Sequence, residues 1–231
     1  MLVGDATVPG LAIGDGYACY RGPVADSTLH RHAAFQVAIA VRGEVAILDA
    51  AGTCHRAAAL VVPPMTRHQM LAATDVLTYF IEPQCAFADR LRECRGITSA
   101  VELRGLREEE LRPAAARLSG ALDPRLVAAM DATAAASGLS MPDLAARVDL
   151  SPQRLRALAR QQLGMPLTRW RAWARLRRAA EALNDGQSLA DAAGTAGFAD
   201  QAHFTRWMRE MMGLTPSAVL PALRGHSRRA V

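Results

Sequence analysis

Residues 143–166 read DLAARVDLSPQRLRALARQQLGMP, and residues 191–216 read DAAGTAGFADQAHFTRWMREMMGLTP. The aspartates that open the two segments are 48 residues apart, and the glycines near their ends, Gly164 and Gly213, are 49 residues apart. Each segment places two short helical patterns around a turn, as a helix-turn-helix does. Two such copies in tandem on an arginine-rich background are typical of a protein that reads DNA.

The net charge is divided unevenly along the chain. Residues 1–120 hold 12 arginines and 13 acidic residues, whereas residues 121–231 hold 15 arginines and 9 acidic residues. Lysine is absent, and a GC-rich coding sequence is the simplest reason for that absence. The positive balance therefore lies on the half that carries the repeat, as a phosphate-binding surface requires.

Several functional classes are disfavoured by what the sequence lacks. No apolar run approaches the roughly 18 residues of a membrane span, and the first ten residues, MLVGDATVPG, have no basic segment like that of a secretory signal. The four cysteines form no CxxC pair, which favours reduced thiols. There is no G-x-S-x-G, no HExxH and no phosphate loop. We therefore expect a cytoplasmic protein that is not an enzyme and has no membrane partner.

The half of the chain after Asp123-Pro124 is predicted to be entirely helical. Ser151 followed by Pro152 is a typical helix start. The fourth helix, with 18 residues at 1.5 Å each, spans about 27 Å, so that recognition helices at its two ends can reach neighbouring major-groove faces about 34 Å apart. The predicted helices cover residues 126–137, 141–148, 151–163, 167–184 and 189–195, with a sixth that begins after a cap at Asp200.

The third and sixth of these helices each show an apolar face and a polar face. The predicted buried positions are Leu155, Leu158, Ala159 and Leu163 in the third helix, and Phe204, Trp207, Met208 and Met211 in the sixth. The predicted outward positions are Gln153, Arg156 and Arg160 in the third helix, and Ala202, Arg206 and Arg209 in the sixth. The outward stripes can be offered to a DNA groove, and the more regular stripe of the third helix predicts that the first unit carries more of the discrimination.

The first half of the chain predicts a β domain. Short β-favouring runs at residues 35–41, 44–50, 58–64 and 76–82 are separated by turn signals, which indicates an antiparallel sandwich or small barrel. Helical patterns follow from residue 86 to about residue 118. The predicted fold class is therefore α+β with several domains: a β domain at 1–85, a helical segment and linker at 86–122, a helical domain at 123–225 and a basic tail at 226–231. The family resemblances described below imply that the first of these is a sensory domain, that the second dimerises and that the third binds DNA.

Residues 140–220 resemble the AraC/XylS family of bacterial transcriptional regulators. The resemblance lies in the stretches LSPQRLRALARQQLGMPLTRW, RLRRAAEAL and AGFADQAHFTRWMREMMGLTPSAV. The chain departs from the family pattern at Ala192-Ala193, at Trp207-Met208 and at Leu220. The resemblance implies a domain of two helix-turn-helix motifs joined by a long helix, whose third and sixth helices enter successive major grooves.

The resemblance also implies which side chains read DNA. Arginine pairs bidentately with guanine and glutamine with adenine. By position, the residues implied to read bases are Gln153, Arg156, Gln201, His203 and Arg206, of which His203 lies beside the buried face. Arg154, Arg169 and Arg175 are expected to contact phosphates or to brace the connecting helix, and Arg160 and Arg209 complete the predicted DNA-binding set.

A second resemblance, to cupin β-barrels, involves histidines of the first half. His30-x-His32 is followed by Gln36, and His68 follows later. In metal-binding cupins an HxH pair, a glutamate and a later histidine hold the metal. Here Gln36 stands for the glutamate, which removes an anionic ligand and should weaken divalent metal binding. Three interpretations stay open: His30, His32 and His68 hold a metal, the same residues with Gln36 line a pocket for a small effector, or they are interior residues without a ligand.

Together these observations predict a sequence-specific DNA-binding transcription regulator, an activator or a repressor. The expected partners are double-stranded DNA, a small-molecule effector in the cupin-like domain, a second copy of the chain and, for an activator, RNA polymerase. The alternative from another class is a cupin-type metal-dependent enzyme or metal sensor with an appended DNA-binding domain. A regulator that acts by abundance alone, without an effector, is a further alternative.

Overall fold

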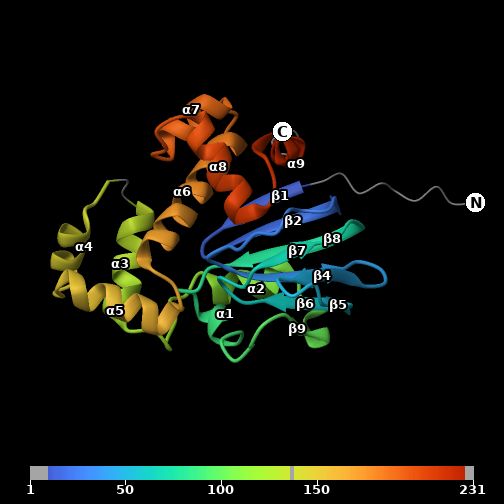
Figure 1. The fold of residues 1–231 in the computed structure, drawn as a ribbon, viewed down its shortest axis with the longest axis horizontal. Helices are drawn as coiled ribbons and strands as arrows, with labels where there is room; N and C mark the ends of the chain where they lie inside the picture. Colours follow the sequence, from blue (N-terminus) through green and yellow to red (C-terminus); the bar gives the residue numbers. More distant parts are fainter. Residues whose placement is uncertain (1–9, 136–137, 227–231) are drawn as a thin grey trace, which may run out of the picture.

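The structure, a computed structural model, describes residues 10–135 and 138–226. Its first half forms two antiparallel sheets, and its second half is helical (Figure 1). The larger sheet has the order β1-β2-β8-β3-β6-β9, and the smaller one has the order β5-β4-β7. The strands are β1 (Gly10–Gly14), β2 (Tyr17–Val24), β3 (Phe35–Ala40), β4 (Val45–Asp49), β5 (Cys54–Ala57), β6 (Ala59–Val62), β7 (His68–Met70), β8 (Ala73–Ile81) and β9 (Thr98–Ser99).

Strand β3 explains how the two sheets are held together. All six of its residues, FQVAIA, are buried. Because successive side chains of a strand point to opposite faces, Ala38 and Ala40 pack toward the smaller sheet, while Val37 and Ile39 pack on the opposite face. A strand covered on both faces needs a continuous apolar run, and this is why β3 shows no polar alternation.

The predicted barrel is not closed, because the strands divide into two separate sheets. What the structure shows is an antiparallel sheet domain followed by a helical domain. The four predicted β-favouring runs correspond to β3, β4, β6 and β8.

The segment after residue 85 differs from the prediction. It contains only the short helix α1 (Ala86–Asp89), the 3₁₀ turn η1 (Val101–Leu103) and helix α2 (Glu108–Ala115). The apolar side chains of this segment, Phe87 and Leu111 among them, share one buried cluster with Val37 and Ile39 of the sheet. The segment therefore covers the outer face of the sheet.

The helices of the second half follow the prediction closely. They are α3 (Pro124–Ala135), α4 (Met141–Arg147), α5 (Pro152–Leu163), α6 (Leu167–Asn184), α7 (Leu189–Thr195), α8 (Gln201–Met212) and α9 (Pro216–His226). The end of the predicted first helix at residues 136–137 and residues 227–231 of the predicted basic tail lie outside the described residues, as does the N-terminal segment 1–9. None of the described helices is both long and apolar enough to cross a membrane.

The repeat is visible in the caps of these helices. Ser140 and Ser188 each accept a hydrogen bond from the backbone amide three residues later, at 3.2 Å in both cases, and so begin α4 and α7. Ser151 begins α5 in the same way. Helices α5 and α8 both end at a glycine in the left-handed conformation, Gly164 with φ of 67° and Gly213 with φ of 66°. The two segments are thus copies in structure as well as in sequence.

Candidate functional site

The outward face of α5 is exposed. Its four predicted DNA-binding residues are exposed, while the apolar positions between them are buried as expected. Ser151 Oγ accepts a hydrogen bond from the amide of Arg154 at 3.1 Å and fixes the start of the helix. The exposed residues are Gln153, Arg154, Arg156 and Arg160.

Helix α8 presents an equivalent face, with one exception. Gln201, Arg206 and Arg209 are exposed, but both ring nitrogens of His203 face donors inside the motif. Its Nδ1 lies 3.3 Å from the amide nitrogen of Ala199, and its Nε2 lies 2.9 Å from Nε1 of Trp207. A neutral imidazole accepts at one ring nitrogen, so one of these two donors is bound at a time. His203 therefore braces the turn and the helix, which is the packing role that its position beside the buried face also allowed.

Arginines of the connecting helix α6 brace the domain. Arg169 is 8% exposed, is ion-paired with Glu210 and lies over the ring of Trp207, which ties α6 to α8. Arg178 donates to the carbonyl of Ala134 at 2.8 Å and also to that of Ala196, so it links α3 to α7. Arg169 thus takes the bracing alternative rather than the phosphate contact. Arg175 is half-buried, and Arg178 was not singled out from the sequence.

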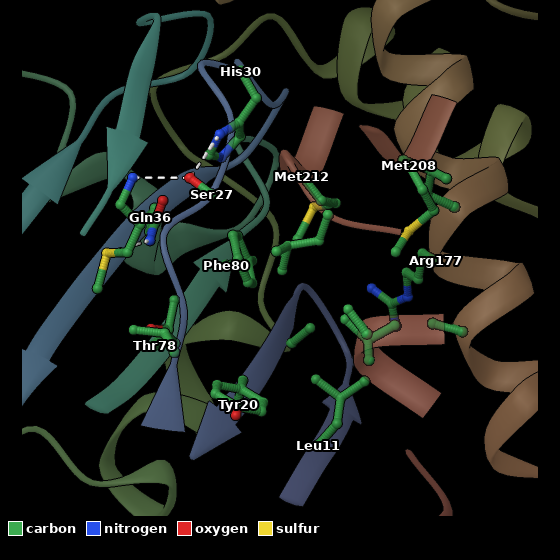
Figure 2. A pocket seen from close by; sticks show the side chains of 18 of the residues that line it. Leu11, Tyr20, Ser27, His30, Gln36, Thr78, Phe80, Arg177, Met208 and Met212 are labelled. Atoms are coloured by element: carbon green, nitrogen blue, oxygen red, sulfur yellow. Dashed lines mark hydrogen bonds between the residues drawn. The ribbon is translucent and has the colours of Figure 1, made fainter. Parts of the chain in front are cut away.

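A cavity of about 540 Å³ lies between the sheet domain and the helical domain. Strands β1, β2 and β8 form one wall, and helices α6, α8 and α9 form the other (Figure 2). Its volume falls in the range of small-molecule sites. Most of its lining is apolar, including Leu11, Phe80, Trp173, Leu176, Met208, Met212 and Val219.

The cavity has one polar end and one ionic wall. The polar end holds Ser27, His30, Gln36 and Thr78, all buried. The ionic wall is formed by Glu82, directly after β8, and Arg177 of α6, whose Nη1 lies 3.0 Å from the Glu82 carboxylate. Burial opposes the charge on Arg177, but the neighbouring carboxylates of Glu82 and Glu181 raise the pKa of the guanidinium above its ordinary value.

The histidines predicted from the sequence converge beside this polar end. His30 lies in an isolated bridge with His68, and His32 lies in the connection before β3. The chain nevertheless folds so that one ring nitrogen of each of the three histidines lies within 4.8 Å of those of the others. Oε1 of Gln36 lies 3.0 Å from Nε2 of His32 and 2.9 Å from Nε2 of His68.

Hydrogen bonds to the backbone orient the three rings. Nδ1 of His30, His32 and His68 lies 2.8, 2.7 and 3.0 Å from the carbonyls of Thr28, Ala34 and Thr66, respectively. A carbonyl only accepts, so each Nδ1 carries the proton and each Nε2 keeps its lone pair. Neutral imidazoles held in this way by backbone carbonyls are the form that binds metals. Three imidazoles and a Gln36 oxygen fit a divalent ion such as zinc or iron.

Burial keeps the cluster uncharged. It lowers the pKa of His30 to about 4, with a further contribution from His32, and the pKa of His68 to about 2. Burial also lowers the pKa of His32, against the hydrogen bonds to Gln36 and to the Ala34 carbonyl. The polar end of the cavity is therefore neutral at physiological pH.

The end of α8 docks directly on the segment before the histidines. The amide of Thr28 donates to the carbonyl of Gly213 at 3.1 Å, and the hydroxyl of Thr28 reaches the same carbonyl at 3.3 Å. A Cβ on Gly213 would lie 2.6 Å from the carbonyl oxygen of Thr28 and 2.7 Å from Nδ1 of His30. This close approach needs a glycine, so the second helix-turn-helix unit is seated against the sheet domain.

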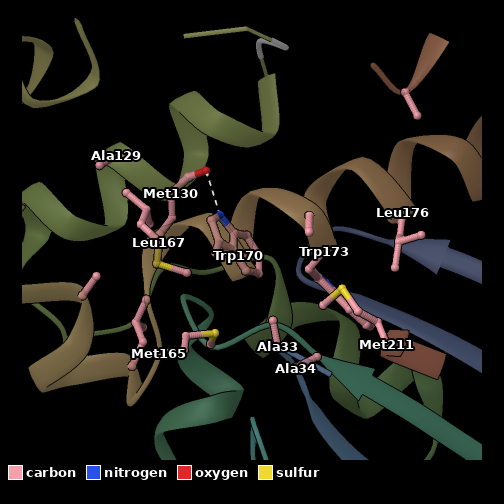
Figure 3. Close-up of a cluster of buried hydrophobic side chains, with 14 of the residues drawn as sticks. Ala33, Ala34, Ala129, Met130, Met165, Leu167, Trp170, Trp173, Leu176 and Met211 are labelled. Atoms are coloured by element: carbon pink, nitrogen blue, oxygen red, sulfur yellow. Dashed lines mark hydrogen bonds between the residues drawn. The ribbon is translucent and has the colours of Figure 1, made fainter. Parts of the chain in front are cut away.

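The two domains also share a hydrophobic core (Figure 3). Trp170 of α6 is fully buried and donates from Nε1 to the carbonyl of Met130 in α3 at 3.1 Å. Ala33 and Ala34, from the sheet domain, belong to the same cluster of buried side chains. The connecting helix α6 is thus the element against which both domains pack.

Comparison with known proteins decides the identity of the helical half. A family model described as a helix-turn-helix domain matches residues 144–221. These residues form an AraC-type helix-turn-helix domain. Helix α3 lies before the matched residues and packs on α6 of the AraC-type domain.

Solved structures show a similar fold over nearly the whole chain. ToxT from Vibrio cholerae matches with a TM-score of 0.61 and 11% sequence identity, covering 91% of this chain and 99% of ToxT. ToxT in its unsaturated fatty acid-bound form matches with a TM-score of 0.61 and 10% identity, covering 90% of this chain and 96% of that one. These likenesses extend the ToxT-like fold to the sheet domain that precedes the AraC-type domain.

A third structure is similar over the helical half alone. It is a transcriptional regulator of the AraC type from Chromobacterium violaceum, 26% identical, with a TM-score of 0.41; the match covers 47% of this chain and 96% of that one. No match was found among curated proteins.

Sequence reasoning missed the ionic wall and the helical wall of the cavity. Glu82 and Arg177 are 95 residues apart and carry no motif. Trp173 and Leu176 lie at helical spacing on one buried face of α6, and part of that face lines the cavity. Periodicity identifies which face of a helix is buried. It does not indicate whether other side chains or a ligand cover that face.

Proposed function

We propose that this chain is a sequence-specific DNA-binding transcription regulator whose DNA binding is controlled by a small molecule in the cavity between its two domains. The AraC-type domain supports the DNA-binding part. The observation that carries the regulatory part is the double role of α8. Its outer residues Gln201, Arg206 and Arg209 are exposed, while Phe204, Met208 and Met212 of the same helix line the cavity.

Helix α8 couples the DNA-binding face to the cavity, because both are formed by side chains of this one helix. A ligand in the cavity touches the helix that we assign to base reading in the second unit, and it touches the sheet domain on the opposite side. Ligand binding therefore biases two arrangements of α8 by the difference in its affinity for them. The unsaturated fatty acid in the ToxT structure supports a ligand of mainly apolar character.

We assign base reading to Gln153 and Arg156 in the first unit, and to Gln201 and Arg206 in the second. Arg154, Arg160 and Arg209 are the candidates for phosphate contact, because they are exposed on or beside the same faces. The sheet domain serves as a cupin-like sensory domain in this proposal, and the protein works in the cytoplasm, as an activator through RNA polymerase or as a repressor.

The proposed dimer uses the segment 86–122. Most of its apolar side chains are buried against the sheet, but Val101 and Leu118 are 55% and 60% exposed. Large exposed apolar side chains of this kind favour contact with a second copy. Analytical ultracentrifugation of the wild type and of a Val101→Arg, Leu118→Arg variant tests the assignment, since only the wild type should dimerise.

A genome-wide footprint of the bound protein tests the proposed function directly. The wild type should occupy defined sites, and the Arg156→Ala, Arg206→Ala double variant should lose them. Addition of a ligand found by thermal-shift screening should change that occupancy. Identical footprints of the two proteins would overturn the DNA-reading assignment, and occupancy that ignores every bound ligand would overturn the regulatory one.

Metal sensing is the second candidate function, and the orientation of the histidine rings favours it. Nε2 of His32 and Nε2 of His68 both face the Gln36 oxygen, within 3.0 Å, although none of these three atoms carries a hydrogen, and a ring nitrogen of His30 lies within 4.8 Å of those of the other two histidines. A bound cation satisfies this arrangement, and so does a rotated Gln36 amide that donates to both rings. Stoichiometric zinc, iron or manganese in the purified protein, lost in a His32→Ala variant, would support the metal. Its absence after growth in metal-supplemented medium would favour the rotated amide.

A further inference from the structure

The charges around the cavity limit what it can bind. Among the described residues that line it, Glu82 supplies the carboxylate and Arg177 supplies the guanidinium. The remaining wall is apolar or carries neutral polar groups. Any charge on a ligand must therefore be balanced by this one pair.

Arg177 is already fully engaged. Its Nη1 lies 3.0 Å from the Glu82 carboxylate, and its Nε donates to Glu181 at 2.9 Å. Its Nη2 donates to the carbonyl of Gly14 at 2.7 Å. All three guanidinium nitrogens thus have a protein acceptor, and two carboxylates share one cation. Glu82 and Arg177 balance each other in the ionic wall, and Glu181 adds a second carboxylate to the same guanidinium, so an anionic ligand meets no uncompensated cation among the described lining residues.

Glu82 is held equally firmly. Its Oε1 accepts from Nε1 of Trp173 at 3.2 Å, and its Oε2 accepts from Nε2 of Gln84 at 2.8 Å. The carboxylate therefore stays in the wall, where it repels a second carboxylate at short range. A ligand carboxylate in the cavity would be buried without a counter-charge, which is strongly unfavourable.

The polar end of the cavity can bind an uncharged polar group of a ligand. Nδ1 of His30 donates to the backbone of Thr28, so its Nε2 remains an acceptor. Ser27 and Thr78 add hydroxyls, which can both donate and accept. A hydroxyl on a ligand has hydrogen-bonding partners of both kinds here without any charge.

We propose that the cavity binds an uncharged, mainly apolar molecule with a hydroxyl-type hydrogen-bonding end, and that it discriminates against carboxylates. The proposal rests on the proposed function, because it takes this cavity to be the effector site. It also separates this chain from the fatty acid-bound ToxT, since a similar fold here surrounds a cavity whose arginine is neutralised.

Three probes with the same ten-carbon chain test the proposal on the full-length protein: decanol, decanoate and decylammonium. Binding is followed by thermal shift and by the fluorescence of Trp173, which lines the cavity. We expect decanol to bind at least tenfold more tightly than decanoate and more tightly than decylammonium. An Ala180→Phe variant fills the cavity from α6 and should lose decanol binding.

A Glu82→Gln, Glu181→Gln variant reverses the discrimination. It keeps side chains of similar shape and frees the guanidinium of Arg177, so decanoate should gain at least tenfold while decanol changes little. Tighter binding of decanoate or decylammonium than decanol to the wild type, or binding of none of the three, would overturn the proposal.

The same experiment separates the ligand class from the proposed function. Operator binding that responds to decanoate and ignores decanol would overturn the uncharged ligand and leave the effector-controlled regulator intact. Operator binding that ignores decanol bound in the cavity would overturn the effector-controlled regulator, although the ligand class would stand.

Discussion

Glu82 and Arg177 form an ion pair across the domain boundary, with the Glu82 carboxylate 3.0 Å from Nη1 of Arg177. Glu82 follows β8 of the sheet domain, and Arg177 lies in the middle of α6 (Figure 2). The Glu82 side chain is 6% exposed and that of Arg177 21%. The pair therefore holds the sheet against the connecting helix and at the same time sets the charge of the cavity wall.

Removing Glu82 should destabilise the fold. A Glu82→Ala variant leaves the largely buried Arg177 with Glu181 as its remaining carboxylate partner and with the carbonyl of Gly14. Losing one member of a buried pair is strongly destabilising. Because Arg177 is partly exposed, we expect a loss of about 2–4 kcal/mol, or roughly 5–10 °C in Tm. Calorimetry measures it.

Arg125→Ala provides the control, because Arg125 and Asp123 form a pair of similar length, 2.8 Å, in which the arginine side chain is 49% exposed. Its Tm should stay close to that of the wild type. Equal changes in the two variants would show that the Glu82 pair is no more important than a surface pair.

Substitution of Gly213 should loosen α8 from the sheet domain. Gly213→Ala places a methyl group 2.6 Å from the Thr28 carbonyl oxygen, in addition to the cost of a left-handed alanine. Gly164→Ala is the matched control, because Gly164 has nearly the same φ and nothing within 4 Å of the added Cβ.

Both variants should lose about 1 kcal/mol from the left-handed conformation, and Gly213→Ala roughly 1–3 kcal/mol more from the clash. Hydrogen exchange should show faster opening in α8 and in residues 25–30 of the Gly213→Ala variant alone. A similar loss of stability in both variants, with unchanged exchange, would mean that α8 is not held by this contact.

Local patterns predicted most of the helical half and less of the sheet half. The caps at Ser151 and Asp200 and the glycines after α5 and α8 are short-range signals, and α6 begins and ends where its apolar periodicity predicts. Residues 86–122 were predicted as a helical dimerisation segment and linker, and local sequence held no signal that Phe87 and Leu111 of this segment pack on β-strands far away in the sequence.

The candidate sites follow the same division. Exposed arginines on α5 could be placed from helical spacing alone. The grouping of His30, His32 and His68 was predicted from the resemblance to cupins, and in the structure His30 pairs with His68 through an isolated bridge. The cavity could not be predicted, because it depends on how α6 and α8 dock on the sheet, and local sequence carries no signal for that docking.

The buried histidines should make the protein acid-sensitive. In the unfolded chain a histidine takes up a proton near pH 6.5, whereas burial lowers the pKa of His30 to about 4 and of His68 to about 2 in the folded protein. Between pH 6.5 and 4 the unfolded state therefore binds more protons, so stability falls as the pH falls. Each such histidine contributes about 1.4 kcal/mol per pH unit well below pH 6.5.

Denaturant unfolding between pH 7 and 5, with a chelator present, measures this slope. His30→Gln should reduce the slope of the unfolding free energy against pH by the contribution of about one histidine. His55→Gln, which lies outside the cluster, should change this slope less. A slope that is the same in the wild type and in His30→Gln would show that His30 is not held neutral in the folded protein.

Arginines on the two recognition helices should contribute unequally to DNA affinity. Arg156→Ala and Arg206→Ala should each cost about 1–3 kcal/mol on the operator if these side chains pair with bases, and each should relax the preference at one position. We expect the larger loss for Arg156, because α5 offers the more regular outward stripe and α8 is anchored at Gly213 to the sheet domain. Arg154→Ala should weaken binding to every DNA sequence by a similar factor, and it should reduce the number of counterions released on binding by about one.

The control is Arg67→Ala, because Arg67 is an exposed arginine of the sheet domain. This variant should bind DNA as the wild type does. Fluorescence anisotropy with operator and scrambled duplexes at two salt concentrations distinguishes these outcomes. Equal weakening of both duplexes by Arg156→Ala would move that residue from base reading to phosphate contact.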